Sequence, residues 1–155
     1  MRLTWKRTVG VGAVCVSVLV WWGATHHDAV VAQTRKQVMM TRIYTGPDGK
    51  THAEEVEITL AGSNPLNEVS ALFKVTGAEV HRQQPGWSQD WHPVGRRQLV
   101  ITLSGHGEVE LADGTKIAEV PGHILLAEDT TGQGHISRVI GKEERVSIQL
   151  PLADQ

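Results

Sequence analysis

The sequence predicts an all-β domain, a closed barrel or sandwich of short antiparallel strands, behind an apolar N-terminal segment. Three observations support this fold class. Apolar and polar residues alternate along several stretches, as they do from Glu55 to Leu60, and a period of two is typical of half-buried strands. Clusters of Gly, Pro and Asp separate these stretches at intervals of about 8 to 12 residues. The length of 155 residues fits one domain.

The predicted domain begins with a hairpin and continues as a series of short strands. Residues 40–45 and 50–60 form the hairpin arms, because Pro47 presets φ for the turn between them and the following Asp and Gly tolerate a tight bend. Residues 62–73 interrupt the alternation, and their Ser-Asn-Pro sequence is compatible with the start of a short helix. Residues 85–95 are expected to form a loop. The remaining expected strands are 78–84, 97–103, 107–111, 116–120, 123–128, 135–140 and 145–150.

The first 32 residues differ in composition from the rest of the chain. Three basic residues within the first seven positions precede an uncharged apolar run from Thr8 to Ala24, and Ala32 is a small residue suited to a cleavage site. The apolar run of about 17 residues is at the lower limit for a helix that spans a bilayer. Residues 1–32 are therefore interpreted either as a cleaved signal peptide or as an uncleaved membrane-anchor helix, with residues 36–155 as the exported domain. Both alternatives predict a periplasmic or extracellular location.

Charge and cysteine content exclude some function classes. Removing residues 1–32 removes three basic residues and one acidic residue, which leaves 12 Lys and Arg against 16 Asp and Glu, a net charge of −4. No basic run remains beyond Arg96–Arg97, so nucleic-acid binding is not expected. The lone cysteine, Cys15, lies in the apolar run, so the domain is expected to fold without a disulfide.

Side-chain parity along residues 97–103 indicates a polar site inside the barrel. Successive strand residues point to opposite faces. Gln98, Val100 and Thr102 therefore share one face, and Leu99, Ile101 and Leu103 share the other. If the first set faces the interior, Gln98 meets His135, which begins another predicted strand.

Two motifs then resemble those of the cupin superfamily of small jelly-roll barrels. The first cupin motif ends with Glu, six residues and Gly, and here Gln98 and Gly105 have that spacing. Counting back from Gln98 places Val94 and His92 at the two histidine positions of the motif. The second cupin motif is resembled by Pro121-Gly122-His123, which is followed by the apolar run ILLA and then by His135. The resemblance covers about residues 40–150. Within the superfamily, it is closer to a subgroup of single-domain cupins of unassigned function.

The resemblance implies a metal site of three histidines and one glutamate, from which this sequence departs. His92 and His135 occupy histidine positions, but Val94 cannot bind a metal and Gln98 replaces the glutamate. One divalent metal (Fe, Ni or Zn) would need a further carboxylate ligand, for which Glu128 or Asp129 is available. The open alternative is that His92, Gln98 and His135 form a hydrogen-bonded polar cluster, either around an organic ligand or without one.

Two functions of different classes follow from the resemblance. The first is an exported cupin that binds a small polar or anionic ligand and retains a degenerate metal site, and the second is a metal-dependent cupin enzyme, dioxygenase-like or isomerase-like, acting on a small organic acid. The expected partner is a small molecule, with a homodimer as an open alternative and membrane contact only through an uncleaved N-terminal segment. The candidate ligand-binding residues are Arg96, Arg97, Gln98, Trp91, Thr102 and Asp129, and the candidate metal ligands are His92, Gln98, Glu128 and His135.

Overall fold

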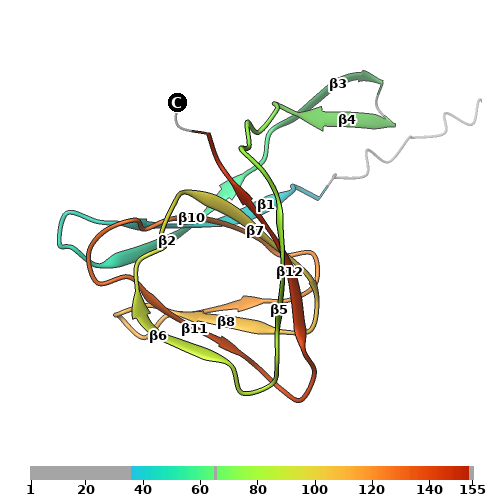
Figure 1. Cartoon of the computed structure of the whole chain (residues 1–155). Helices are drawn as coiled ribbons and strands as arrows, with labels where there is room; N and C mark the ends of the chain where they lie inside the picture. Colours follow the sequence, from blue (N-terminus) through green and yellow to red (C-terminus); the bar gives the residue numbers. More distant parts are fainter. Residues whose placement is uncertain (1–35, 65, 154–155) are drawn as a thin grey trace, which may run out of the picture. The chain divides into compact units, whose positions relative to one another are not determined.

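The computed structural model describes residues 36–64 and 66–153, and all regular secondary structure in this part of the chain is β-structure (Figure 1). The predicted signal peptide or anchor helix, residues 1–32, lies outside the described residues. Within the described part, no helix is long and apolar enough to span a membrane.

Two sheets face each other across the domain (Figure 1). The larger sheet has the strand order β2 (Thr51–Glu57), β1 (Met39–Thr45), β10 (Ile124–Glu128), β7 (Gln98–Ser104), β12 (Arg145–Pro151) and β5 (Glu79–Gln83). The smaller sheet has the order β6 (Ser88–His92), β11 (His135–Val139), β8 (Gly107–Glu110) and β9 (Lys116–Glu119). From β5 to β8 and again from β9 to β12, consecutive strands alternate between the two sheets, and the result is a jelly-roll barrel.

The strand pairings are antiparallel with one departure from the expectation. Among the described strands, β1 and β10 pair in parallel, with Ile43 opposite Ala127, whereas the other pairings are antiparallel. Parallel neighbours need a long crossover connection. The chain between β1 and β10 supplies this connection, because it contains most of the other strands.

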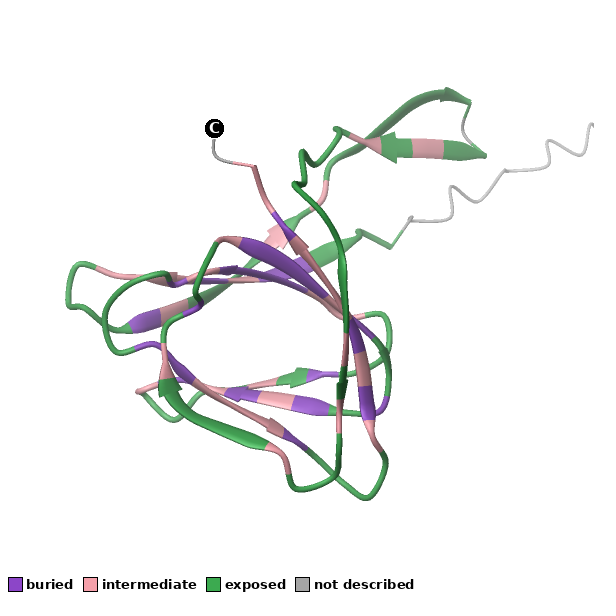
Figure 2. Cartoon of the chain, in the orientation of Figure 1, coloured by how far each residue is buried: buried purple, intermediate pink, exposed green. Residues whose placement is uncertain are grey.

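The residues that alternate along the strands of the larger sheet form two apolar clusters. Ile43, Val100, Leu125 and Ala127 belong to one cluster, together with Val109 of the smaller sheet. The intervening residues Met40, Leu99 and Leu126 belong to the other cluster. This division follows from the two-residue period of a strand. Buried residues occur in the strands of both sheets, whereas the hairpin of residues 60–64 and 67–70 is mostly exposed (Figure 2).

Two local expectations differ from the structure. In place of a short helix, β3 (Leu60–Asn64) and β4 (Asn67–Ser70) pair as a separate hairpin. The predicted loop at 85–95 contains β6, which is mostly exposed and is held by pairing with β11. Both pairs depend on contacts between strands rather than on a buried face, so hydrophobic alternation could not predict them.

Candidate functional site

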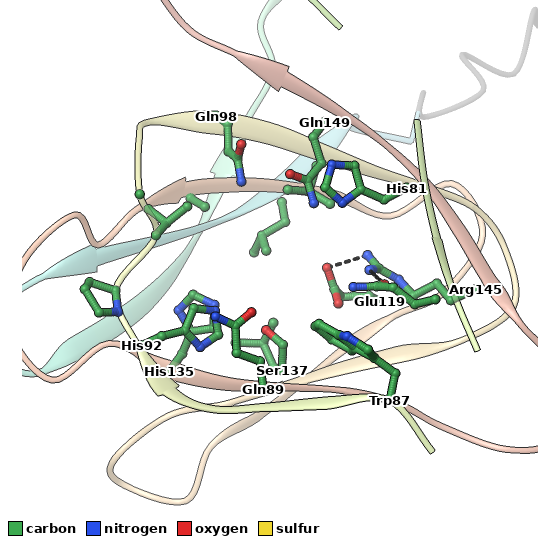
Figure 3. A pocket seen from close by; sticks show the side chains of 18 residues that line it. His81, Trp87, Gln89, His92, Gln98, Glu119, His135, Ser137, Arg145 and Gln149 are labelled. Atoms are coloured by element: carbon green, nitrogen blue, oxygen red, sulfur yellow. Dashed lines mark hydrogen bonds and ion pairs between the residues drawn. The ribbon is translucent and has the colours of Figure 1, made fainter. Parts of the chain in front are cut away.

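A cavity of about 420 Å³ lies between the two sheets and is lined by residues of both. Its apolar wall includes Val94, Val100 and Leu125. Several lining residues are partly exposed, so the cavity opens to solvent. Figure 3 shows the polar side chains that project into it. The polar residues of the lining are His81, Gln83, Gln89, His92, Gln98, Glu119, His135, Ser137, Arg145 and Gln149.

Two histidines form one end of the polar lining. His92 ends β6 and His135 begins β11, and these residues are paired across the two strands. Their ring centroids are 4.5 Å apart (Figure 3). Gly134 makes this approach feasible, because it has φ of +74° and a Cβ there would lie 2.0 Å from the His92 backbone. Any other residue at 134 would both strain the backbone and push the histidines apart.

Hydrogen bonds fix the protonation geometry of both rings. The fully buried Asp129 accepts through Oδ2 from His135 Nδ1 at 2.6 Å and from Thr51 Oγ1 at 3.0 Å. His92 Nδ1 donates to the Asp90 carbonyl at 2.8 Å. In a neutral imidazole whose Nδ1 donates, Nε2 carries the lone pair. Burial and the neighbouring His135 lower the pKa of His92, so the neutral form of this ring is favoured at pH 7.

A buried ion pair forms another part of the lining. Arg145 Nη2 lies 2.8 Å from Glu119 Oε1, and both side chains are only 5% exposed. Arg145 also donates to Gln83 Oε1 and to Thr102 Oγ1, each at 2.9 Å. Gly107 leaves room for the pair, since a Cβ there would lie 2.7 Å from Glu119 Oε2. Burial raises the pKa of Glu119, although the charge of Arg145 opposes this rise.

The two adjacent arginines and Glu128 do not line this cavity. Glu128 follows the cavity-lining Ala127 on β10 and therefore points to the opposite face of the sheet. There it accepts hydrogen bonds from Arg97 and from Arg42. Burial acts to raise the pKa of Glu128, but these two hydrogen bonds lower it below its usual value overall. Arg96 donates to Glu79 at 2.7 Å.

The remaining predicted ligand-binding residues have other surroundings. Thr102 is buried and accepts the hydrogen bond from Arg145. Asp129 lies behind His135 rather than in the cavity wall. Trp91 is 40% exposed and does not line the cavity, whereas Trp87 does. Of the predicted site residues, the structure therefore places Gln98, His92 and His135 in the lining.

The residues present do not fit a resident metal. Gln98 projects from the larger sheet, across the cavity from His92 and His135 (Figure 3). The two candidate carboxylates are hydrogen-bonded elsewhere, Glu128 to arginines and Asp129 to Thr51 as well as His135. In the described part of the chain, no group of three or more His, Cys, Asp or Glu residues is placed to hold a metal ion.

Sequence reasoning missed several residues of the lining, above all Glu119, Arg145 and Gln149. A signal for two of them was present. Arg145 and Gln149 have the same parity along β12, so a polar face of that strand could be read from the sequence. Which face points inward could not be read, because apolar residues of β12 occupy the other face, where Leu150 packs against the second apolar cluster.

Comparisons with known proteins concern the fold. No protein-family model matches the chain, and no curated protein matches it in sequence. Among solved structures, the cupin domain of Cnp3 from Schizosaccharomyces pombe is 16% identical with a TM-score of 0.40, covering 77% of this chain and 86% of that one. A cupin-like protein from Thermotoga maritima is 17% identical with a TM-score of 0.40, covering 63% and 68%.

A similar likeness is found to an RmlC-like cupin protein from Desulfovibrio desulfuricans, which is 12% identical with a TM-score of 0.37 and is matched over 79% of this chain and 92% of that one. Such distant likenesses carry no information on function. The two facing sheets themselves define the jelly-roll barrel. The all-β jelly-roll barrel expected from the sequence is thus confirmed as a fold, and function has to be argued from the cavity.

Proposed function

We propose that this chain is an exported binding protein that holds a small polar molecule in the cavity between its two sheets. The volume of the cavity and the composition of its wall support the proposal. Its volume of about 420 Å³ lies in the range of roughly 300–1,000 Å³ that small-molecule pockets occupy. Its lining combines an apolar wall with polar side chains that project inward from both sheets, and this combination binds and orients a small ligand.

The amide groups of the lining support a binding role. Among the described residues, no group is hydrogen-bonded to the side chains of Gln89, Gln98 or Gln149, although all three line the cavity. Gln98 is only 8% exposed. Polar side chains at such sites normally have partners. A bound molecule, or water in its absence, would supply the missing hydrogen bonds.

The metal-dependent enzyme is less well supported by the same geometry. His92 and His135 supply two imidazoles, and neither the amide of Gln98 nor the carboxylate of Glu128 adjoins them (Figure 3). Asp129 orients His135 through Nδ1, which is also a common arrangement behind a metal-binding histidine. Two protein ligands nevertheless fall short of the three that catalytic zinc sites use.

Replacing Gln98 with glutamate separates the metal-free proposal from the metal-dependent alternative. Without a metal, the variant places a carboxylate in the wall with no counter-ion, so the free energy of unfolding should fall by about 1–3 kcal/mol at pH 7. Gln133→Glu, in an exposed loop, is the matched control and should cost little. Chemical denaturation together with metal analysis gives both readouts. A Gln98→Glu protein that gains stability and stoichiometric metal would contradict the proposal.

Export is supported by the basic start, the apolar run from Thr8 to Ala24 and the small residue Ala32. N-terminal sequencing of the protein recovered from an exporting host should find a first residue near Gln33. An intact Met1 in the membrane fraction would favour the anchor. An intact Met1 in soluble cytosol would refute both forms of the export proposal.

A further inference from the structure

The charged groups that line the cavity leave no net charge for an ionic ligand. Glu119 and Arg145 neutralise each other at 2.8 Å. Arg145 is further committed to Gln83 and to Thr102. A ligand carboxylate or ammonium would have to displace a partner from this buried pair, and leaving a buried charge unpaired is costly.

Each histidine of the lining either has its neutral form favoured or lies beside a carboxylate. Burial favours the neutral form of His92 by lowering its pKa. His135 donates through Nδ1 to Asp129, whose carboxylate faces it directly. His81 Nε2 lies 3.3 Å from Glu79 Oε2. Glu119 and Arg145 are paired with each other, and His135 and His81 each have a carboxylate partner, so the described lining offers an ionic ligand no unpaired charged partner.

The uncharged polar groups have the chemistry of partners for hydroxyl groups. Gln89, Gln98 and Gln149 each offer a donor and an acceptor, and Ser137 Oγ offers both in one atom. None of these four side chains has a hydrogen-bond partner among the described residues. They approach the cavity from opposite sheets (Figure 3). A ligand that satisfies them must donate and accept at several points of its circumference, as a ring bearing hydroxyl groups does.

The apolar part of the lining suits the faces of such a ring. The Trp87 side chain is part of the cavity lining (Figure 3). The backbone from which the indole projects is held by hydrogen bonds to Gln84 and Val139. An indole offers a large flat surface against which the C–H groups of a ring can pack.

We infer that the ligand is a neutral, polyhydroxylated molecule of monosaccharide size, such as a hexose or a cyclic polyol. The inference deepens the proposed binding function and rests on it. It narrows the earlier expectation of a polar or anionic ligand to the neutral class. Because no charge is engaged, its binding should depend little on salt concentration.

Isothermal titration of the full-length protein with matched sugars tests the inference. The panel contains hexoses and inositols, the corresponding hexuronates and hexose phosphates, and hexosamines. A neutral member should bind at least about tenfold more tightly than its anionic and cationic counterparts, and raising the salt concentration should leave its affinity unchanged within about twofold. Gln149→Leu and Trp87→Ala should each weaken binding by roughly three- to tenfold. Arg97→Ala, outside the cavity, is the control and should not.

The outcomes distinguish failure of the neutral-ligand inference from failure of the binding proposal. Tighter binding of an anionic or cationic counterpart would overturn the neutral-ligand inference and leave the binding proposal standing. Neutral binding that persists unchanged in both cavity variants would overturn the inference by placing the sugar elsewhere. If no panel member binds, the inference is wrong. The binding proposal itself fails only if chemically diverse fragments also leave the cavity unoccupied.

Discussion

Replacing Arg145 with methionine should lower the free energy of unfolding by about 3–5 kcal/mol at pH 7. The change leaves the Glu119 carboxylate buried without its partner and removes the donor on which Gln83 and Thr102 depend. Because the loss comes from an unpaired charge, the double variant Arg145→Met/Glu119→Leu should recover most of it. Urea denaturation of the wild type and the variants measures these differences. Equal losses in the single and double variants would show that the pair does not behave as a buried ion pair.

The same variant predicts a pH dependence with a definite sign. Burial raises the pKa of Glu119 even with Arg145 present, and without Arg145 the rise should be larger. A carboxyl group with a raised folded-state pKa destabilises the fold while it is ionised. The penalty is therefore fully present above the folded-state pKa and disappears as pH falls below the ordinary carboxyl pKa. The deficit of Arg145→Met should shrink on acidification, whereas a deficit that grows would contradict the assignment.

Replacing Ile43 with alanine should cost about 2–5 kcal/mol of unfolding free energy. Ile43 is completely buried in the cluster that also contains Val109 of the facing sheet, so truncation leaves a hole between the two sheets. Leu66→Ala is the control, because Leu66 is 93% exposed and should change stability by no more than about 0.5 kcal/mol. A loss near zero for Ile43→Ala would mean that the inward and outward faces of β1 have been exchanged.

Much of the barrel could be predicted from the sequence because its strands carry a clear alternation. Gln98 and Val100 face the cavity and Leu99 belongs to the other apolar cluster, as the parity of this stretch predicts. The edge strand β6 could not be predicted, because it is exposed along most of its length and has no apolar face. Pairing with β11 creates it, and that contact spans more than 40 positions of the sequence.

The candidate site was less predictable than the fold for a related reason. Glu128 was expected near His135 because it is close in sequence, but one step along a strand reverses the direction of a side chain. Arg145 and Glu119 meet although 26 residues separate them. Their contact depends on how the two sheets are placed across the barrel. Sequence spacing identifies residues on one strand face, whereas convergence of faces from different sheets requires the tertiary structure.

Methyl and indole NMR of the protein purified from an exporting host, titrated with a chemically diverse fragment set, tests the central claim most directly. If the cavity binds small molecules, some fragments should cause saturable shifts at the methyl groups of Val100, Val109 and Leu125 and at the Trp87 indole, all of which line it. Leu99, in the other apolar cluster, should be unaffected. Shifts confined to Leu99 and its neighbours, or no saturable shift at the cavity groups with any fragment, would contradict the claim that this cavity is a binding site.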